Sequence, residues 1–417
     1  EIHGYYTQFQ VEPCSPTHDP NNEYDLFIDT AMQQGEAFAA AAISNNDTIN
    51  SVQIPMRDYL KVTDDGSLEW VPFDDMSSSY TPQYAMLHGV NAYTVELPYG
   101  SQDAVTAVKY GFVGNAEFVS ENKDEMFLNQ LERYERGIEN IDADEIRPYY
   151  VSQSDEVGAE ADVFRPRYEE NNNFFPEYYV IPVDSDAQLD RAAAAEMVEY
   201  LLRNDVRLEQ LTEDFEVNGT TYAEGTVVVD MHQAKRNMAN AALYENMVID
   251  DWTSLYSEPV TNFPDQRGFD CDTITTPGAF DDAALTDLAE PIELATEVDG
   301  EGDLVVIENS GVESIRAVNA LLDDGVQVGL VTEGESAGDY VVASSDFDAV
   351  KDDFVLDAHK VAEAPTAQVI KTGIKVYVPG AVDEFMTNEA GEEYGVRDYQ
   401  NRLNTTYNMD IFALTEQ

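Results

Sequence analysis

A large excess of negative charge constrains this chain of 417 residues more than any other feature. It contains 82 Asp and Glu residues against 22 Lys and Arg, which gives a formal net charge of -60. Charges of this density repel one another over the Debye length, which is about 10 Å at 0.1 M salt. At 1 M salt the Debye length is about 3 Å, so the repulsion is largely screened. The sequence therefore predicts a protein of a halophile, folded in concentrated salt.

The same composition excludes several classes of protein. Hydrophobic residues make up 43% of the chain and aromatic residues 11%, so it can bury cores and is not an acidic disordered protein. The length favours two to four domains. Without a Lys or Arg cluster, neither nucleic acid nor an anionic membrane is an expected partner. No apolar run is long enough to span a membrane.

Cys14 and Cys271 are the two cysteines of the chain. Two cysteines are too few for a disulfide framework, and their spacing is not that of a metal site. The sequence leaves two readings open, a Cys14–Cys271 bridge or two buried thiols.

Residues 1–142 read as one α/β segment. Apolar spacing predicts helices over residues 24–43 and 121–141, and Ser101 is placed to cap a helix that begins near Gln102. Residues 91–97 read as a strand. Residues 143–175 read as a linker or a covering loop.

Two stretches about 120 residues apart then repeat one strand-helix-strand plan. The first contains residues 178–181, a helix ending at 201–206 and residues 225–229; the second contains residues 304–307, a helix ending at 321–326 and residues 338–342. Short apolar strands joined by helical crossovers favour a parallel sheet, which we expect the two stretches to share. This α/β domain would cover 176–370, and residues 371–417 would begin a further α/β unit or close this one.

No complete active site can be assembled from the residues alone. The five histidines show neither His-x-x-Glu nor His-x-x-x-His spacing, and Walker loops and dinucleotide fingerprints are absent from the sequence. Acidic pairs are expected everywhere in such a composition and indicate a solvated surface. Arg147, Arg165 and Arg167 flank the linker, and we expect them to pair with carboxylates.

Two short segments nevertheless carry a family resemblance. Glu1-Ile2-His3-Gly4-Tyr5 resembles the segment that delivers the third zinc ligand in carboxypeptidase A-like zinc metallopeptidases, and Ala92-Tyr93-Thr94-Val95-Glu96-Leu97 is similar to the strand that bears their general base. The resemblance implies that His3 is a metal ligand and Glu96 the catalytic base, with Tyr80 as a substrate-binding tyrosine. It also implies an incomplete carboxypeptidase-like mixed sheet with flanking helices over 1–142.

The resemblance also shows what this sequence lacks. The family's His-x-x-Glu zinc pair and its carboxylate-binding arginines lie upstream of the segment that matches here. We therefore expect a shared zinc site, completed by an N-terminal segment of the same precursor, in a secreted or cell-surface carboxypeptidase of a haloarchaeon or bacterium that acts on peptides or proteins. A cytoplasmic location stays open. The alternative is a structural or assembly protein that keeps the scaffold and forms homo-oligomers or surface arrays.

Overall fold

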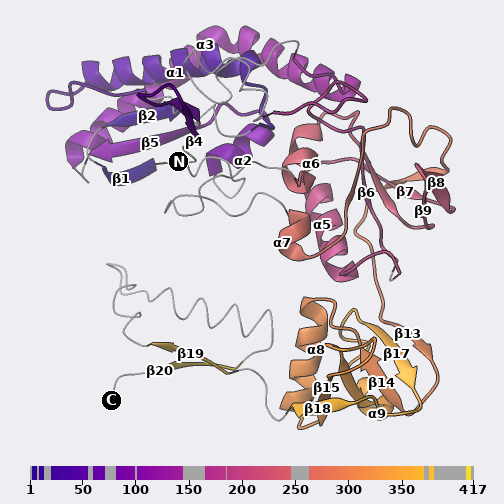
Figure 1. Ribbon diagram of the computed structural model, residues 1–417. Coiled ribbons are helices and arrows are strands. Elements are labelled where there is room, and N and C mark those ends of the chain that lie inside the picture. Colours follow the sequence, from indigo (N-terminus) through magenta and orange to yellow (C-terminus); the bar gives the residue numbers. More distant parts are fainter. Residues whose placement is uncertain are drawn as a thin grey trace. The chain divides into compact units, whose positions relative to one another are not determined.

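The computed structural model describes residues 2–6, 9–13, 20–54, 60–70, 81–98, 101–143, 165–184, 186–245, 263–370, 375–379 and 410–414 (Figure 1). The chain divides into two compact units. Unit 1 comprises Glu1–Pro182, Glu199–Arg267 and Cys271–Glu290, and unit 2 comprises Val183–Val198, Gly268–Asp270 and Pro291–Gln417. Helices and strands occur in both units, so the predicted α/β class is confirmed.

Unit 1 begins with a three-stranded mixed sheet. Its strands are β1 (Ile2–Tyr6), β2 (Gln10–Pro13) and β5 (Tyr93–Pro98). The order is β1-β5-β2, with β1 parallel and β2 antiparallel to β5. A separate antiparallel pair consists of β3 (Leu60–Val62) and β4 (Leu68–Trp70). The helices here are α1 (Tyr24–Ser44), α2 (Thr81–Leu87) and α3 (Gln102–Glu139).

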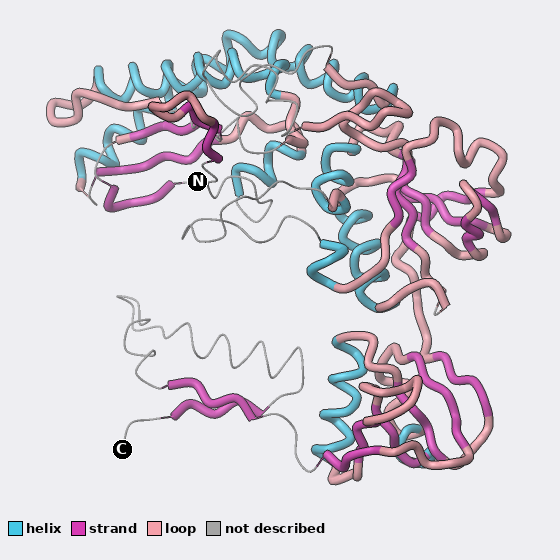
Figure 2. Tube along the Cα trace, in the orientation of Figure 1, coloured by secondary structure: helices cyan, strands magenta, loops and turns pink. Residues whose placement is uncertain are grey.

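Helices α1 and α3 run side by side along one face of this sheet (Figure 2). Their shared core contains Phe9, Val11, Phe38, Ala42, Val95, Ala107 and Val108. The predicted start of α3 is confirmed, because Ser101 accepts a hydrogen bond of 3.1 Å from the backbone N–H of Ala104 and the helix begins at Gln102. The two predicted helical stretches of this region form one helix of 38 residues.

Two glycines of α3 allow it to approach α1 closely. A Cβ atom at Gly111 would lie 2.4 Å from the ring of Phe38. A Cβ atom at Gly114 would lie 2.4 Å from the Cβ of Ala41 and 2.7 Å from the carbonyl oxygen of Ala37. The second obstacle includes backbone, which cannot rotate away, so a larger residue requires the helices to move apart.

We therefore expect Gly114→Ala to lower the free energy of unfolding by about 1–3 kcal/mol, through overpacking. The sign is informative because Ala is otherwise the better helix former, by about 1 kcal/mol. The exposed Ser120 of the same helix provides a matched control. Urea denaturation in concentrated KCl should show Ser120→Ala neutral or stabilising, and a stabilised Gly114→Ala protein would refute this packing.

A five-stranded sheet completes unit 1. Its strands are β6 (Tyr178–Ile181), β7 (Leu208–Leu211), β10 (Val227–Asp230), β11 (Asp272–Ile274) and β12 (Leu285–Leu288). A hairpin of β8 (Phe215–Val217) and β9 (Thr220–Tyr222) precedes β10. Helices α6 (Arg236–Leu243) and α7 (Phe263–Arg267) belong to unit 1 as well, and α5 (Arg191–Arg203) begins in unit 2 and ends in unit 1. All four residues of β6 are buried, as expected for a central strand.

Unit 2 contains a six-stranded sheet. Its strands are β13 (Glu297–Gly300), β14 (Leu304–Ile307), β15 (Val328–Val331), β16 (Tyr340–Ala343), β17 (Asp357–Val361) and β18 (Ala367–Ile370). The helices are α8 (Val312–Asp323) and α9 (Ser344–Phe347). A parallel pair of β19 (Lys375–Pro379) and β20 (Asp410–Leu414) lies later in the chain.

The two sheets have one topology. The first has the order β11-β6-β10-β7-β12, and the second has the order β17-β14-β16-β15-β18 with β13 added beside β17. Every corresponding pair of neighbours is antiparallel. We call these two α/β modules the first and the second module.

The predicted shared parallel sheet is wrong, because each repeat forms its own, mainly antiparallel sheet. Only β13 and β17 pair in parallel within these two sheets. In each module an additional strand, β7 or β15, lies between the helix and the last predicted strand. The chain reverses its direction after this strand and reaches the last strand through Gly225 or Gly338. Both glycines have a positive φ, 94° and 109°, which a tight reversal favours.

The repeated helix ends also share one capping geometry. Val206 donates its N–H to the carbonyl of Leu201, and Val326 donates to that of Leu321, at 3.1 and 2.9 Å. In each case the residue before the valine is left-handed. This Schellman motif explains why the segments 201–206 and 321–326 look alike in sequence.

Candidate functional site

The structure brings His3 and Glu96 together. They are register partners on the parallel strands β1 and β5, and Gln10 of β2 pairs with Glu96 on the other side. The neighbouring residue Val95 is buried in the core under α1 and α3. Successive residues of a strand alternate between faces, so Glu96 belongs to the face opposite that core. Glu96 itself is half-buried.

The other predicted site residues are not brought into this place. Tyr80 and Cys14 lie outside the described residues, so the substrate-binding tyrosine and the Cys14–Cys271 bridge both stay predictions. Cys271 is buried, immediately before β11.

A catalytic zinc ion requires about three protein ligands. Within the described ranges, no three or more His, Cys, Asp or Glu side chains are grouped so that they would hold a metal ion. His3 and Glu96 are two residues, fewer than the protein ligands that a catalytic zinc ion requires.

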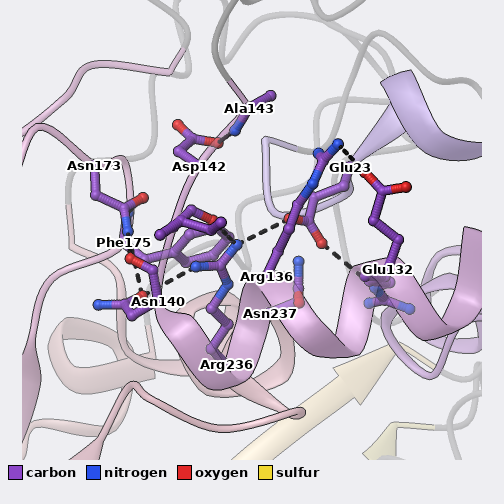
Figure 3. Close-up of polar contacts among 12 residues, drawn as sticks. Glu23, Glu132, Arg136, Asn140, Asp142, Ala143, Asn173, Phe175, Arg236 and Asn237 are labelled. Atoms are coloured by element: carbon purple, nitrogen blue, oxygen red, sulfur yellow. Dashed lines mark hydrogen bonds and ion pairs between the residues drawn. The ribbon is translucent and has the colours of Figure 1, made fainter.

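A buried ionic cluster in unit 1 escaped the sequence analysis. Its centre is Arg236 of α6, whose side chain is fully buried and lies 2.9 Å from a carboxylate oxygen of the equally buried Glu23 (Figure 3). The guanidinium also donates to the side-chain oxygen of Asn140 at 3.1 Å and to the carbonyl of Ile141 at 2.6 Å. It stacks 4.1 Å from the centre of the Phe175 ring. The buried positive charge of Arg236 is thus paired with one carboxylate and hydrogen-bonded to two further oxygen atoms. A buried charge needs such partners to offset the loss of water.

Further arginines pair with Glu23 and with two other carboxylates, Asp25 and Asp142. Arg133 lies 3.9 Å from Glu23, and Arg136 lies 2.8 Å from Asp25. Arg165 contacts Asp142 at 2.5 Å and Arg167 contacts it at 3.5 Å. The expected pairing of Arg165 and Arg167 with carboxylates is thus confirmed, and Arg147 lies outside the described residues.

Charge balance within the cluster explains the state of Asp142. Burial raises its pKa, but the guanidinium groups of Arg165 and Arg167 outweigh burial and hold the pKa below its ordinary value. Asp142 is therefore ionised at neutral pH. The cluster joins residues 20–25, the end of α3, residues 165–175 and α6, so its role is to fasten these segments of unit 1 together.

Two histidines of unit 1 have opposite electrostatic surroundings. The Nδ1 atom of His232 lies 3.0 Å from Asp230, and this hydrogen bond raises the pKa of His232 above 6.5 although burial opposes it. The Nδ1 atom of His88 lies 2.9 Å from the ammonium of Lys235. Burial, followed by the charges of Lys235 and Arg133, lowers the pKa of His88 below 6.5.

Titration by NMR should separate the two rings, with the midpoint of His232 above 6.5 and that of His88 below it. The raised pKa of His232 makes a stabilising contribution that is complete below the unfolded value of about 6.5 and is lost as the pH rises through the folded pKa. Asp230→Asn should lower the midpoint of His232 and leave that of His88 in place. Midpoints in the reverse order would contradict these geometries.

Comparison of the chain with protein-family models, curated proteins and solved structures found no match. The carboxypeptidase resemblance accordingly rests on the two segments quoted above. None of the helices in the described part of the chain has the length and hydropathy of a membrane span.

Proposed function

We propose that residues 1–142 are the C-terminal part of a zinc-dependent carboxypeptidase-like catalytic domain that hydrolyses peptides. One observation supports this most directly: His3 and Glu96, chosen from segments far apart in the sequence, are register partners on adjacent parallel strands. Register partners on paired parallel strands lie beside each other along the sheet.

The two residue types suit metal-assisted hydrolysis. A neutral imidazole nitrogen of His3 is a ligand that zinc accepts readily, and the carboxylate of Glu96 can take a proton from an attacking water molecule. Zinc, when bound, polarises the peptide carbonyl and lowers the pKa of water. Glu96 would pass the proton to the leaving amine.

The proposal requires zinc ligands beyond those that the described residues group together. A His-x-x-Glu segment of the same precursor would supply them, and the zinc would then be held jointly. The acidic surface fits a secreted or cell-surface enzyme that works in concentrated salt.

The experiment uses the native protein purified in about 2 M KCl, where the charges are screened. Elemental analysis and mass spectrometry should find one bound zinc per chain and a His-x-x-Glu segment associated with it. Incubation with a peptide should release the C-terminal residue, and a chelator should stop the release. A stable preparation without zinc and without such a segment would exclude this function.

A second proposal is a structural or assembly protein of the cell surface that retains the carboxypeptidase scaffold. The two tandem modules favour it, because five strands of each sheet share one order and repeated structural units can stack into extended assemblies. Electron microscopy distinguishes the two functions: ordered filaments or sheets without peptidase activity support assembly, whereas dispersed, active particles oppose it.

A further inference from the structure

Lys235, in the segment between β10 and α6, contacts a histidine instead of a carboxylate. Its side-chain nitrogen lies 2.9 Å from the Nδ1 atom of His88, which follows α2 within the same unit. By contrast, the side-chain nitrogen of Lys351 lies 2.8 Å from Asp348. Among the described residues, Lys235 forms no ion pair with a carboxylate. Such a lysine is unexpected in a chain with 82 acidic residues.

The surroundings of Lys235 disfavour its positive charge. The residue is half-buried, so its ammonium group is partly removed from water. Burial lowers the pKa of Lys235 below the ordinary 10.5; the charge of Asp205 opposes this shift, and that of Arg133 adds to it. At a given pH, a larger fraction of Lys235 than of an ordinary lysine is therefore neutral. The neutral amine is the nucleophilic form of the side chain.

The imidazole of His88 provides a proton acceptor beside this amine. An ammonium group can only donate hydrogen bonds, so the Nδ1 atom of His88 is the acceptor in the contact with Lys235 and carries no proton. Because the pKa of His88 lies below 6.5, the ring is neutral at neutral pH. A nucleophile and a base within about 2.6–3.2 Å of each other are the arrangement that activates nucleophiles in proteins.

Both members of the pair are held by the structure around them. The carbonyl oxygen of Lys235 accepts hydrogen bonds of 3.0 and 3.1 Å from the N–H groups of Met238 and Ala239 in the first turn of α6. The ring of His88 packs edge-on against that of Tyr84, with 4.8 Å between the ring centres. The amine and the imidazole are therefore in place before any reactant arrives.

We propose that Lys235 is a modification site at which an acyl thioester acylates the side-chain amine, with His88 as the proton acceptor. The amine nitrogen attacks the thioester carbonyl carbon, an N–C bond forms and the C–S bond breaks. The Nδ1 atom of His88 takes the proton that the nitrogen loses, and the leaving thiolate receives it. The amide product no longer carries a positive charge near Arg133. This inference is independent of zinc and of His3 and Glu96.

Incubation of the native protein with S-acetyl-N-acetylcysteamine in about 2 M KCl tests the proposal, because this salt concentration screens the surface charges. Mass spectrometry of the peptides follows the acetylation rate of each lysine. Lys109, an exposed residue of α3, provides the internal comparison. At about pH 8, where an ordinary lysine is almost entirely protonated, we expect Lys235 to react at least tenfold faster than Lys109. Its rate should reach half of the maximum below pH 10.5. Equal or slower reaction of Lys235 would overturn the proposal.

The variant His88→Asn separates the proton acceptor from the other surroundings of Lys235. An Asn side chain can accept a hydrogen bond from the amine but cannot take its proton. The acetylation rate of Lys235 should fall at least tenfold, while its pH midpoint stays below 10.5 because burial and Arg133 remain. His359→Asn, on β17 of unit 2, is the matched control and should leave this rate unchanged. Identical rates in the two variants would exclude His88 as the proton acceptor and overturn the proposal.

Discussion

Replacement of Glu23 by Gln should lower the free energy of unfolding of unit 1 by about 3–5 kcal/mol, the largest stability effect that we expect. The carboxylate of Glu23 is completely buried and lies 2.9 Å from Arg236 and 3.9 Å from Arg133. Its loss leaves two guanidinium groups in the interior with one countercharge fewer. Urea denaturation in concentrated KCl, followed by hydrogen exchange of α3 and α6, measures the effect.

A carboxylate of the same chemistry on the surface provides the control. Glu132 lies 2.8 Å from Arg136, but 53% of its side chain is exposed. Glu132→Gln should therefore cost less than about 1 kcal/mol. The double replacement of Glu23 by Leu and Arg236 by Met should regain part of the stability, since it removes both charges of the 2.9 Å pair together while Arg133 still loses Glu23. Equal losses for Glu23→Gln and Glu132→Gln would show that the cluster does not hold unit 1 together.

The second large effect concerns activity. In the native protein with its complete zinc ligand set, Glu96→Gln should reduce kcat/KM for peptide hydrolysis by about 10²–10⁴-fold, because an amide cannot accept the proton from water. The zinc content should not change, since Glu96 is proposed as the base and not as a ligand. His3→Ala should instead lose zinc.

Glu117, an exposed residue of α3, provides the matched control for this charge change. Glu117→Gln should retain the full kcat/KM and the full zinc content. An active Glu96→Gln enzyme would exclude Glu96 as the base, and a His3→Ala protein with unchanged zinc would exclude His3 as a ligand.

Local signals in the sequence located several elements correctly. The apolar spacing of residues 24–43 corresponds to α1, and the cap at Ser101 to the start of α3. The repeated plan of residues 178–229 and 304–342 corresponds to two modules of one topology. Each of these features depends on neighbouring residues or on a comparison of two stretches, which a sequence displays.

The directions of the strands could not be predicted from the sequence in the same way. The strand β7 consists of Leu208-Glu-Gln-Leu, four residues in which two polar side chains separate two leucines. Such a segment is too short to be identified by periodicity, so the helix seemed to lead directly to the next apolar strand. A missed strand reverses the direction of every strand after it, and the parallel prediction failed for this reason.

The buried arginines show a different limit of prediction from sequence. The cluster around Arg236 combines residues from four distant segments, and no spacing rule connects them: Glu23, Asn140, Phe175 and Arg236. In a chain with 82 acidic residues, Glu23 is indistinguishable from the solvated carboxylates around it. His3 and Glu96 were proposed only because a family resemblance supplied their context.

The most direct test of the account is a zinc-edge anomalous difference map from crystals of the native protein grown in concentrated salt. The proposed function predicts one zinc peak at about 2.0–2.1 Å from an imidazole nitrogen of His3, with Glu96 beside it and a His-x-x-Glu segment completing the coordination. Absence of zinc from His3, in a protein whose other segments are all in place, would contradict the carboxypeptidase proposal.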